Sequence, residues 1–213
     1  MRVFLVTMLV AALVPLVDAA AAGRYEDKPL PLEFGVTSAS RVEPNFGRIA
    51  SAIAAHTGEL RCWSTSDWAR INGEFITEGD GSENLNYVSG FYQPATDRIH
   101  LGPTVCAGLV DLRYRHLHPT YGKAEGRIAL AVVTLAHESM HMRGFLSEST
   151  AECYAEQLVS STAHRLGASW AYGQQLEALS WAKIYPNHPP QYLSTECRDG
   201  GKLDLNAKSH VFP

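Results

Sequence analysis

The chain has 213 residues, of which 46% are hydrophobic and 19% are charged. This length allows one domain with a substantial hydrophobic core and is short for two full-sized domains. The formal net charge of −4 and the scattered Lys and Arg residues argue against a nucleic-acid partner, because nucleic-acid-binding proteins carry a clustered basic surface.

The first 22 residues differ in composition from the rest of the chain. Arg2 precedes an apolar run at residues 3–17, and small residues follow. This order is typical of a cleavable secretory signal peptide, here with cleavage after Ala19 or Ala21. A membrane anchor is the alternative, but the run contains Pro15 and is shorter than the roughly 20 residues that span a bilayer. We therefore predict a secreted or periplasmic protein without stable membrane insertion after cleavage. The remaining residues, 23–213, are expected to form a single domain.

The four cysteines of the chain are Cys62, Cys106, Cys153 and Cys197. In an oxidising compartment an even number of cysteines indicates disulfides. We expect Cys62 to pair with Cys106 and Cys153 with Cys197, because neighbours in sequence close the shorter loops. A zinc cluster built from cysteines is a weaker alternative, because the sequence contains no C-x-x-C pair.

Along the mature chain, strand-like patterns precede helix-like ones. Residues 23–45 are rich in proline and predict an extended lead-in, followed by a helix that ends before Gly58. The middle of the chain predicts a β-rich region, and the hydrophobic period becomes helical from Thr104 onward. The predicted elements are a helix at 49–56, strands at 60–63, 84–93 and 98–101, a turn at 94–97, and helices at 126–142, 150–166 and 169–184. This order predicts an α+β domain with an irregular tail that Cys197 holds in place.

The clearest functional signal is the sequence H-E-x-x-H at residues 137–141. His137 and His141 are four residues apart, so on a helix their imidazoles project from one face and can bind one metal ion. Glu138 lies about 100° further round the helix, where its carboxylate can act as the general base for a metal-activated water. The apolar residues 128–136 predict that this helix is buried.

The alternative is an ordinary helix that happens to contain two histidines. With nine histidines in 213 residues, the pattern arises by chance in about one chain in 40 of this composition. Two histidines at the end of a buried helix also need polar partners. We therefore favour a metal site.

A third ligand is expected shortly after the motif. Gly144 suits the left-handed residue that ends a helix, after which the chain can return toward the metal. Three candidate glutamates follow: Glu148, Glu152 and Glu156. Ser149 and Glu152 also fit a capping box, which would make Glu152 structural. We expect Glu156 to be solvated, because it lies away from the apolar stripe of its predicted helix.

Residues 128–160 resemble the H-E-x-x-H zinc metallopeptidases called zincins, and within them the gluzincins. The segment from Glu148 is similar to a gluzincin pattern of glutamate, two residues, alanine, acid, two residues and alanine. The resemblance implies that Glu148 is the third zinc ligand and that Glu152 supports a zinc-binding histidine. The interval from His141 to Glu148 is shorter than in most gluzincins, and the second acid is glutamate instead of aspartate. The metzincin branch is disfavoured, because Ser147 stands at its third-ligand position.

The sequence thus predicts a secreted zinc-dependent peptidase that acts on a peptide or protein substrate. In this hypothesis His137, His141 and Glu148 hold zinc, and Glu138 takes a proton from the attacking water. The alternative is a secreted protein that binds zinc without catalysis, although such a protein has no evident need for Glu138.

The remaining histidines and the aromatic residues are interpreted as structural. A lone histidine in a strand, such as His100, is more often a packing or surface residue than a ligand. The other histidines considered are expected on the surface or on helices: His116, His118 and His164. The aromatic residues are expected in the core: Tyr87, Phe91, Tyr92, Trp170, Tyr172 and Trp181.

Overall fold

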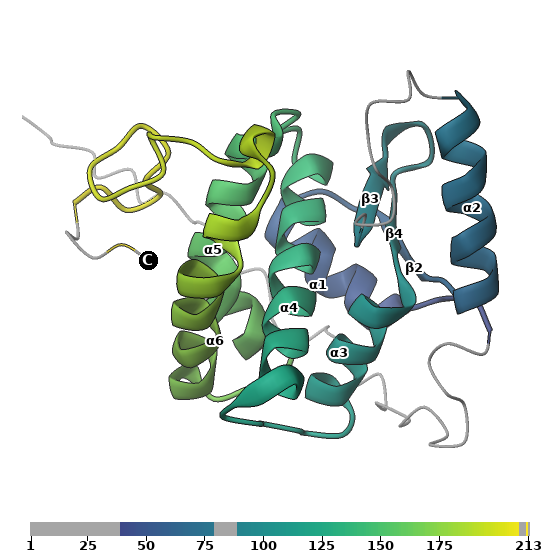
Figure 1. Cartoon of the computed structure of the whole chain (residues 1–213), viewed down its shortest axis with the longest axis horizontal. Coiled ribbons are helices and arrows are strands. Elements are labelled where there is room, and N and C mark those ends of the chain that lie inside the picture. The colour runs from purple at the N-terminus through teal and green to yellow at the C-terminus, as the bar shows by residue number, and fades with distance from the viewer. Residues whose placement is uncertain (1–38, 79–88, 209–211, 213) are drawn as a thin grey trace, which may run out of the picture.

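The computed structural model describes residues 39–78, 89–208 and 212, which form a four-stranded sheet and six α-helices (Figure 1). The strands are β1 (Arg41–Val42), β2 (Glu59–Cys62), β3 (Gly90–Gln93) and β4 (Arg98–Leu101). The helices are α1 (Pro44–Ala54), α2 (Thr65–Glu78), α3 (Pro103–Arg113), α4 (Gly122–Met142), α5 (Glu148–Arg165) and α6 (Trp170–Lys183). Short 3-10 helices are η3 (Pro94–Thr96), η4 (Tyr185–Asn187) and η5 (Pro190–Tyr192). These elements confirm the α+β class.

The sheet separates α2 from the other helices. Its strand order is β1-β2-β4-β3. The central strands β2 and β4 are parallel, and the outer strands pair antiparallel to them. Leu60, Ile99 and Leu101 are fully buried and belong to the main hydrophobic core, which also includes residues of α1, α3 and α4. Figure 1 shows α2 on the other side of the sheet from this helical core.

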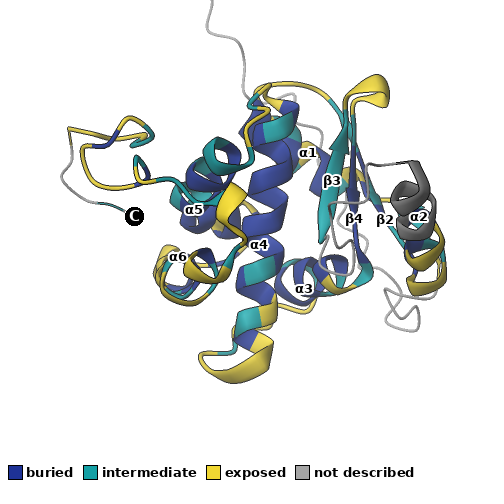
Figure 2. Cartoon of the chain, turned by 45° about the horizontal axis from the view of Figure 1, so that its top comes forward, coloured by how far each residue is buried: buried dark blue, intermediate teal, exposed yellow. Residues whose placement is uncertain are grey.

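Helix α4 runs through the centre of the molecule. Every residue from 131 to 140 is buried, and Figure 2 shows most of α4 in dark blue. This burial agrees with the apolar sequence that precedes the histidines. Helices α3 and α5 pack against α4. Gly108 permits the close approach of α3, because a Cβ atom there would lie only 2.6 Å from the Cβ of Ala131.

Two disulfides tie chain segments to this frame. Cys62 of β2 is bonded to Cys106 of α3, and Cys153 of α5 is bonded to Cys197 of the tail, which confirms both expected pairings. Each bond joins residues 44 positions apart. In the chain-entropy treatment, closing a loop of this length stabilises the fold by about 4 kcal/mol. Two disulfides are typical of exported proteins.

Some predicted elements need correction. Helix α2 was not predicted, although its buried residues Trp68 and Ile71 have the three-residue spacing of one helix face. Helix α1 begins at Pro44, inside the predicted extended lead-in, since proline is well suited to the first position of a helix. The helices predicted at 126–142, 150–166 and 169–184 are present as α4, α5 and α6, with bounds that differ by at most four residues.

Several predictions concern segments outside the described residues. These are the signal peptide at residues 1–22, the lead-in as far as residue 38, and the first part of the strand predicted at 84–93. Within the described ranges, no helix is long and apolar enough to cross a membrane.

The aromatic residues do not all lie in the core. Tyr172 is buried as predicted, whereas Trp170 is 53% exposed. The Trp170 ring instead stacks on His164, with 4.2 Å between the ring centroids. Phe91, Tyr92 and Trp181 are half-buried, and Tyr87 lies outside the described residues.

Candidate metal centre

The metal-binding candidates meet where α4 ends and α5 begins. Gly144 has a φ of +105°, which confirms its predicted left-handed conformation. The Gly144 amide donates to the His141 carbonyl at 2.9 Å, and the Phe145 amide donates to the Met140 carbonyl at 3.1 Å. These two bonds form a Schellman motif, which ends the helix and reverses the chain. Helix α5 then starts at Glu148, so the carboxylate returns to the two histidines within seven residues.

Three side-chain atoms converge at this point. His137 Nε2 and His141 Nε2 lie 2.9 Å apart. Glu148 Oε2 lies 3.1 Å from His137 Nε2 and 3.2 Å from His141 Nε2. These three residues form a group that could hold a metal ion.

The hydrogen bonds behind the imidazoles determine which nitrogens carry protons. His137 Nδ1 contacts Glu152 Oε2 at 2.7 Å, and His141 Nδ1 contacts the carbonyl oxygen of Phe145 at 2.7 Å. An ionised carboxylate and a carbonyl only accept hydrogen bonds, so both Nδ1 atoms must donate. In the neutral imidazoles the Nε2 atoms then carry lone pairs. Three electron-pair donors therefore point at one another, and this arrangement requires a cation or bound protons.

The charges around the cluster favour positive charge at its centre. Burial lowers the pKa of His137, but hydrogen bonds to Glu148 and Glu152 outweigh it and raise that pKa to about 10. Burial also lowers the pKa of His141, but the hydrogen bond to Glu148 and the nearby carboxylate charges outweigh it and raise that pKa. Burial raises the pKa of Glu148, but its bonds to both histidines outweigh it and lower the pKa to about 2. Binding a metal must therefore displace protons from the imidazoles.

Glu138 lies next to this cluster and is buried as well. Its Oε2 atom has no hydrogen-bond partner among the described residues. Burial raises the pKa of Glu138, although the charges of His137 and His141 oppose this effect. A Cβ atom at Gly90 would lie 3.3 Å from Glu138 Cγ, so the side chain is close to the edge strand β3.

Glu152 lies behind His137, and Glu156 is buried. Glu152 binds the outer nitrogen of His137, away from the point where the three atoms converge. The capping-box alternative is wrong, because α5 begins one residue before Ser149, with Ser147 at its N-cap and no side-chain cap bond. The prediction that Glu156 is solvated is also wrong. Helix α6 covers this side of α5, and Glu156 accepts a hydrogen bond from Ser180 Oγ at 2.9 Å.

A segment that the sequence did not connect to the motif also reaches the centre. Residues 185–194, here called the strap, follow α6 and contain η4 and η5. The Tyr192 ring lies 5.7 Å from the His137 ring and 5.4 Å from the His188 ring, measured between centroids. His188 Nδ1 lies 3.6 Å from Glu152 Oε1. The only sequence signal was the tail cysteine Cys197.

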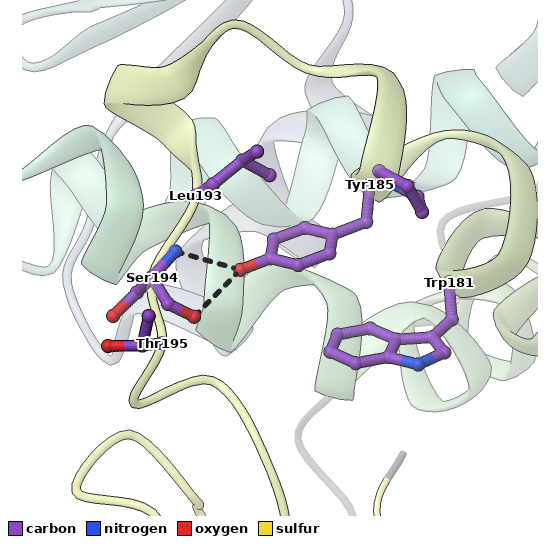
Figure 3. Close-up of a pocket in the computed structure, with 6 residues that line it drawn as sticks. Trp181, Tyr185, Leu193, Ser194 and Thr195 are labelled. Atoms are coloured by element: carbon purple, nitrogen blue, oxygen red, sulfur yellow. Dashed lines mark hydrogen bonds between the residues drawn. The ribbon is translucent and has the colours of Figure 1, made fainter.

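The two ends of the strap are joined (Figure 3). The Ser194 amide donates to the Tyr185 hydroxyl oxygen at 3.1 Å, and the Tyr185 hydroxyl lies 3.5 Å from the Ser194 carbonyl. Trp181 stacks on Tyr185, with 4.8 Å between ring centroids. Beside this closure lies a pocket of about 440 Å³, lined by Trp181, Tyr185, Pro186, Leu193, Ser194 and Thr195.

Comparisons with known proteins give no match. No protein-family model, no curated protein and no solved structure matches the chain.

Proposed function

We propose that this protein is a secreted zinc-dependent peptidase whose metal ligands are His137, His141 and Glu148. The observation that carries the proposal is the convergence of two imidazole lone pairs and one carboxylate oxygen within 3.2 Å of one another. The buried Glu138 beside them supplies a candidate base. The resemblance of residues 128–160 to zincins supports the same assignment.

The spacing of the three atoms suits zinc. Zinc bonds of about 2.0–2.1 Å in a tetrahedral site place neighbouring ligand atoms roughly 3.3 Å apart, close to the 2.9 to 3.2 Å found here. Two neutral imidazoles and one carboxylate are a typical ligand set for catalytic zinc, which keeps a fourth position for water. A bound zinc ion supplies Lewis acidity, which polarises a carbonyl and makes water nucleophilic near neutral pH.

The protein groups have separable roles in this proposal. Glu152 and the Phe145 carbonyl orient His137 and His141 through their Nδ1 atoms, so that both Nε2 atoms face the metal. Glu138 takes up the proton of the attacking water and transfers it to the leaving amine.

The rival function is a zinc-binding protein without catalysis. Glu138 favours the enzyme, because its buried Oε2 lacks a hydrogen bond within the described structure. An unsatisfied buried carboxylate oxygen destabilises a fold. A purely structural site gains nothing from this cost, whereas a general base needs a free oxygen.

The proposal is tested by Glu138→Gln, which keeps the shape of the side chain but removes the base. We expect zinc content to stay at the wild-type level and cleavage of a peptide library to fall by about 10² to 10⁴-fold. Glu125→Gln is the matched control, because Glu125 is a buried glutamate of the same helix near its other end. Undiminished cleavage by Glu138→Gln would remove Glu138 from the mechanism. Zinc binding by the wild type without cleavage of any peptide would favour the rival function.

A further inference from the structure

The strap is built to hold its side chains in fixed positions. A hydrogen bond between Tyr185 and Ser194 joins the two ends of the strap (Figure 3). The Cys153–Cys197 disulfide attaches the residues that follow to α5. Cys153 is the immediate neighbour of Glu152. A covalent bond thus anchors the tail one residue from the carboxylate that orients His137.

Only one of the two carboxylate oxygens of Glu152 has a hydrogen bond within the described residues. Its Oε2 accepts the hydrogen bond from His137 Nδ1 at 2.7 Å. Its Oε1 is buried without a hydrogen-bond partner in the described part of the chain. With a bond on one side only, the carboxylate can still turn and change the direction of its bond to His137.

His188 of the strap is positioned to complete this arrangement. Its Nδ1 lies 3.6 Å from Glu152 Oε1, a few tenths of an ångström beyond ordinary hydrogen-bond length. The Tyr192 ring packs against both His188 and His137. The strap therefore contacts the proposed metal ligand as well as holding His188 beside Glu152.

We propose that His188 is a positioning residue of the metal centre: a shift of a few tenths of an ångström lets its Nδ1–H donate to Glu152 Oε1, which fixes His137 through Glu152. The proposal rests on the proposed function only in requiring a metal at His137, and it does not require peptidase activity. Bonds at both oxygens hold the Glu152 carboxylate in one orientation, which holds the imidazole in one tautomer and one direction. Partners behind a metal ligand commonly change metal affinity in this way.

The experiment measures zinc affinity by competition with a chelator in the full mature chain. His188→Leu should weaken zinc binding about 5- to 10-fold, below the 10- to 100-fold typical for a direct partner of a ligand histidine. His188→Asn should recover most of the loss, because its amide nitrogen lies close to the place of Nδ1. His164→Leu is the control, since His164 also packs against an aromatic ring but at the other end of α5.

A double-mutant cycle separates positioning from general stabilisation. If His188 acts through Glu152, His188→Leu should cost almost nothing in the Glu152→Ala background. The visible spectrum of the cobalt(II)-loaded protein should change in His188→Leu and return toward wild type in His188→Asn.

Three outcomes would overturn the proposal. The first is an unchanged zinc affinity in His188→Leu, and the second is an equal loss with and without Glu152. In both cases the metal site and the proposed peptidase would stand. The third is a wild-type protein that binds no zinc, which would overturn the proposed function as well. Coupling between His188 and Glu152 in a protein that cleaves no peptide would support the positioning role and contradict the peptidase alone.

Discussion

Two buried histidines of this protein occupy opposite electrostatic environments. His137 is 6% exposed and His100 is 5% exposed. The pKa of His137 rises to about 10, whereas the pKa of His100 falls to about 4. Burial lowers both pKa values, so the opposite outcomes come from the neighbouring groups.

The surroundings of His100 contain aromatic rings and positive charge. Its ring stacks on Phe91 at 4.5 Å between centroids, and its Nδ1 accepts a hydrogen bond from Trp63 Nε1 at 3.0 Å. Burial and then the charges of Arg98 and Arg61 lower its pKa. This histidine is neutral and structural, in agreement with the packing role predicted for it.

The surroundings of His137 contain carboxylates on successive turns of α5. Glu148 and Glu152 contact its two nitrogens, one on each side of the ring. His137 differs from His100 in two ways that make it a candidate ligand. Its Nδ1 is held by a hydrogen bond to Glu152, and its Nε2 faces other metal-binding atoms. Burial alone does not distinguish the two cases.

The largest difference between the two histidines is expected in metal binding. His137→Ala or His141→Ala should weaken zinc binding about 100- to 1,000-fold, because roughly 10–16 kcal/mol of zinc binding is shared among about four ligands. His100→Gln should keep wild-type affinity even if it lowers thermal stability. Zinc titration against a competing chelator measures all three variants. Equal losses in His137→Ala and His100→Gln would mean that zinc affinity reports folding and not ligation.

A second effect concerns the pH dependence of stability around the buried carboxylate of Glu156. Burial raises the pKa of Glu156 from its ordinary 4.5 to about 8, and the charge of Glu152 adds to the increase. Between these values the unfolded chain releases this proton and the folded chain keeps it, so stability falls as pH rises from about 4.5 to 8. Glu156→Gln should remove this loss and gain a few kcal/mol relative to wild type by pH 8.5, at about 1.4 kcal/mol per pKa unit.

Urea unfolding at pH 5 and at pH 8.5, with chelator present throughout, measures the difference. Glu196→Gln is the control, because this half-exposed side chain lies in the tail. A constant stability difference between Glu156→Gln and wild type over this range would show that Glu156 is ionised in the folded protein at both pH values.

The smallest effect is expected around His100, which is surrounded by aromatic rings. Trp63→Phe removes the N–H that donates to His100 Nδ1 while keeping an aromatic ring. The bond stabilises the neutral imidazole, so the pKa of His100 should rise by less than about one unit and stability should fall by about 1 kcal/mol. Proton NMR titration of the histidine and thermal melts measure both. A change in zinc affinity in Trp63→Phe would show that the two regions are coupled.

Local sequence signals predicted the parts of the centre that depend on one helix and its end. The four-residue spacing placed His137 and His141 on one face, and Gly144 predicted the reversal that returns Glu148. Both follow from helix geometry, which requires no knowledge of distant segments. The disulfide pairs were predicted from loop length alone.

Contacts between distant segments were not predictable in this way. Glu156 looked solvated because the sequence does not show that α6 covers it with Ser180. His188 and Tyr192 lie in a proline-rich tail without periodicity, and they reach the metal centre through packing of η5 against α5 and through the bond from Cys197 to α5.

The central claim is that His137, His141 and Glu148 bind one zinc ion through two nitrogens and one oxygen. X-ray absorption at the zinc edge of the zinc-loaded protein tests this claim most directly. The account predicts one zinc per chain, nitrogen and oxygen neighbours at about 2.0–2.1 Å, and the multiple scattering of two imidazoles. Sulfur neighbours at about 2.3 Å, a different number of imidazoles, or no stoichiometric zinc would contradict it.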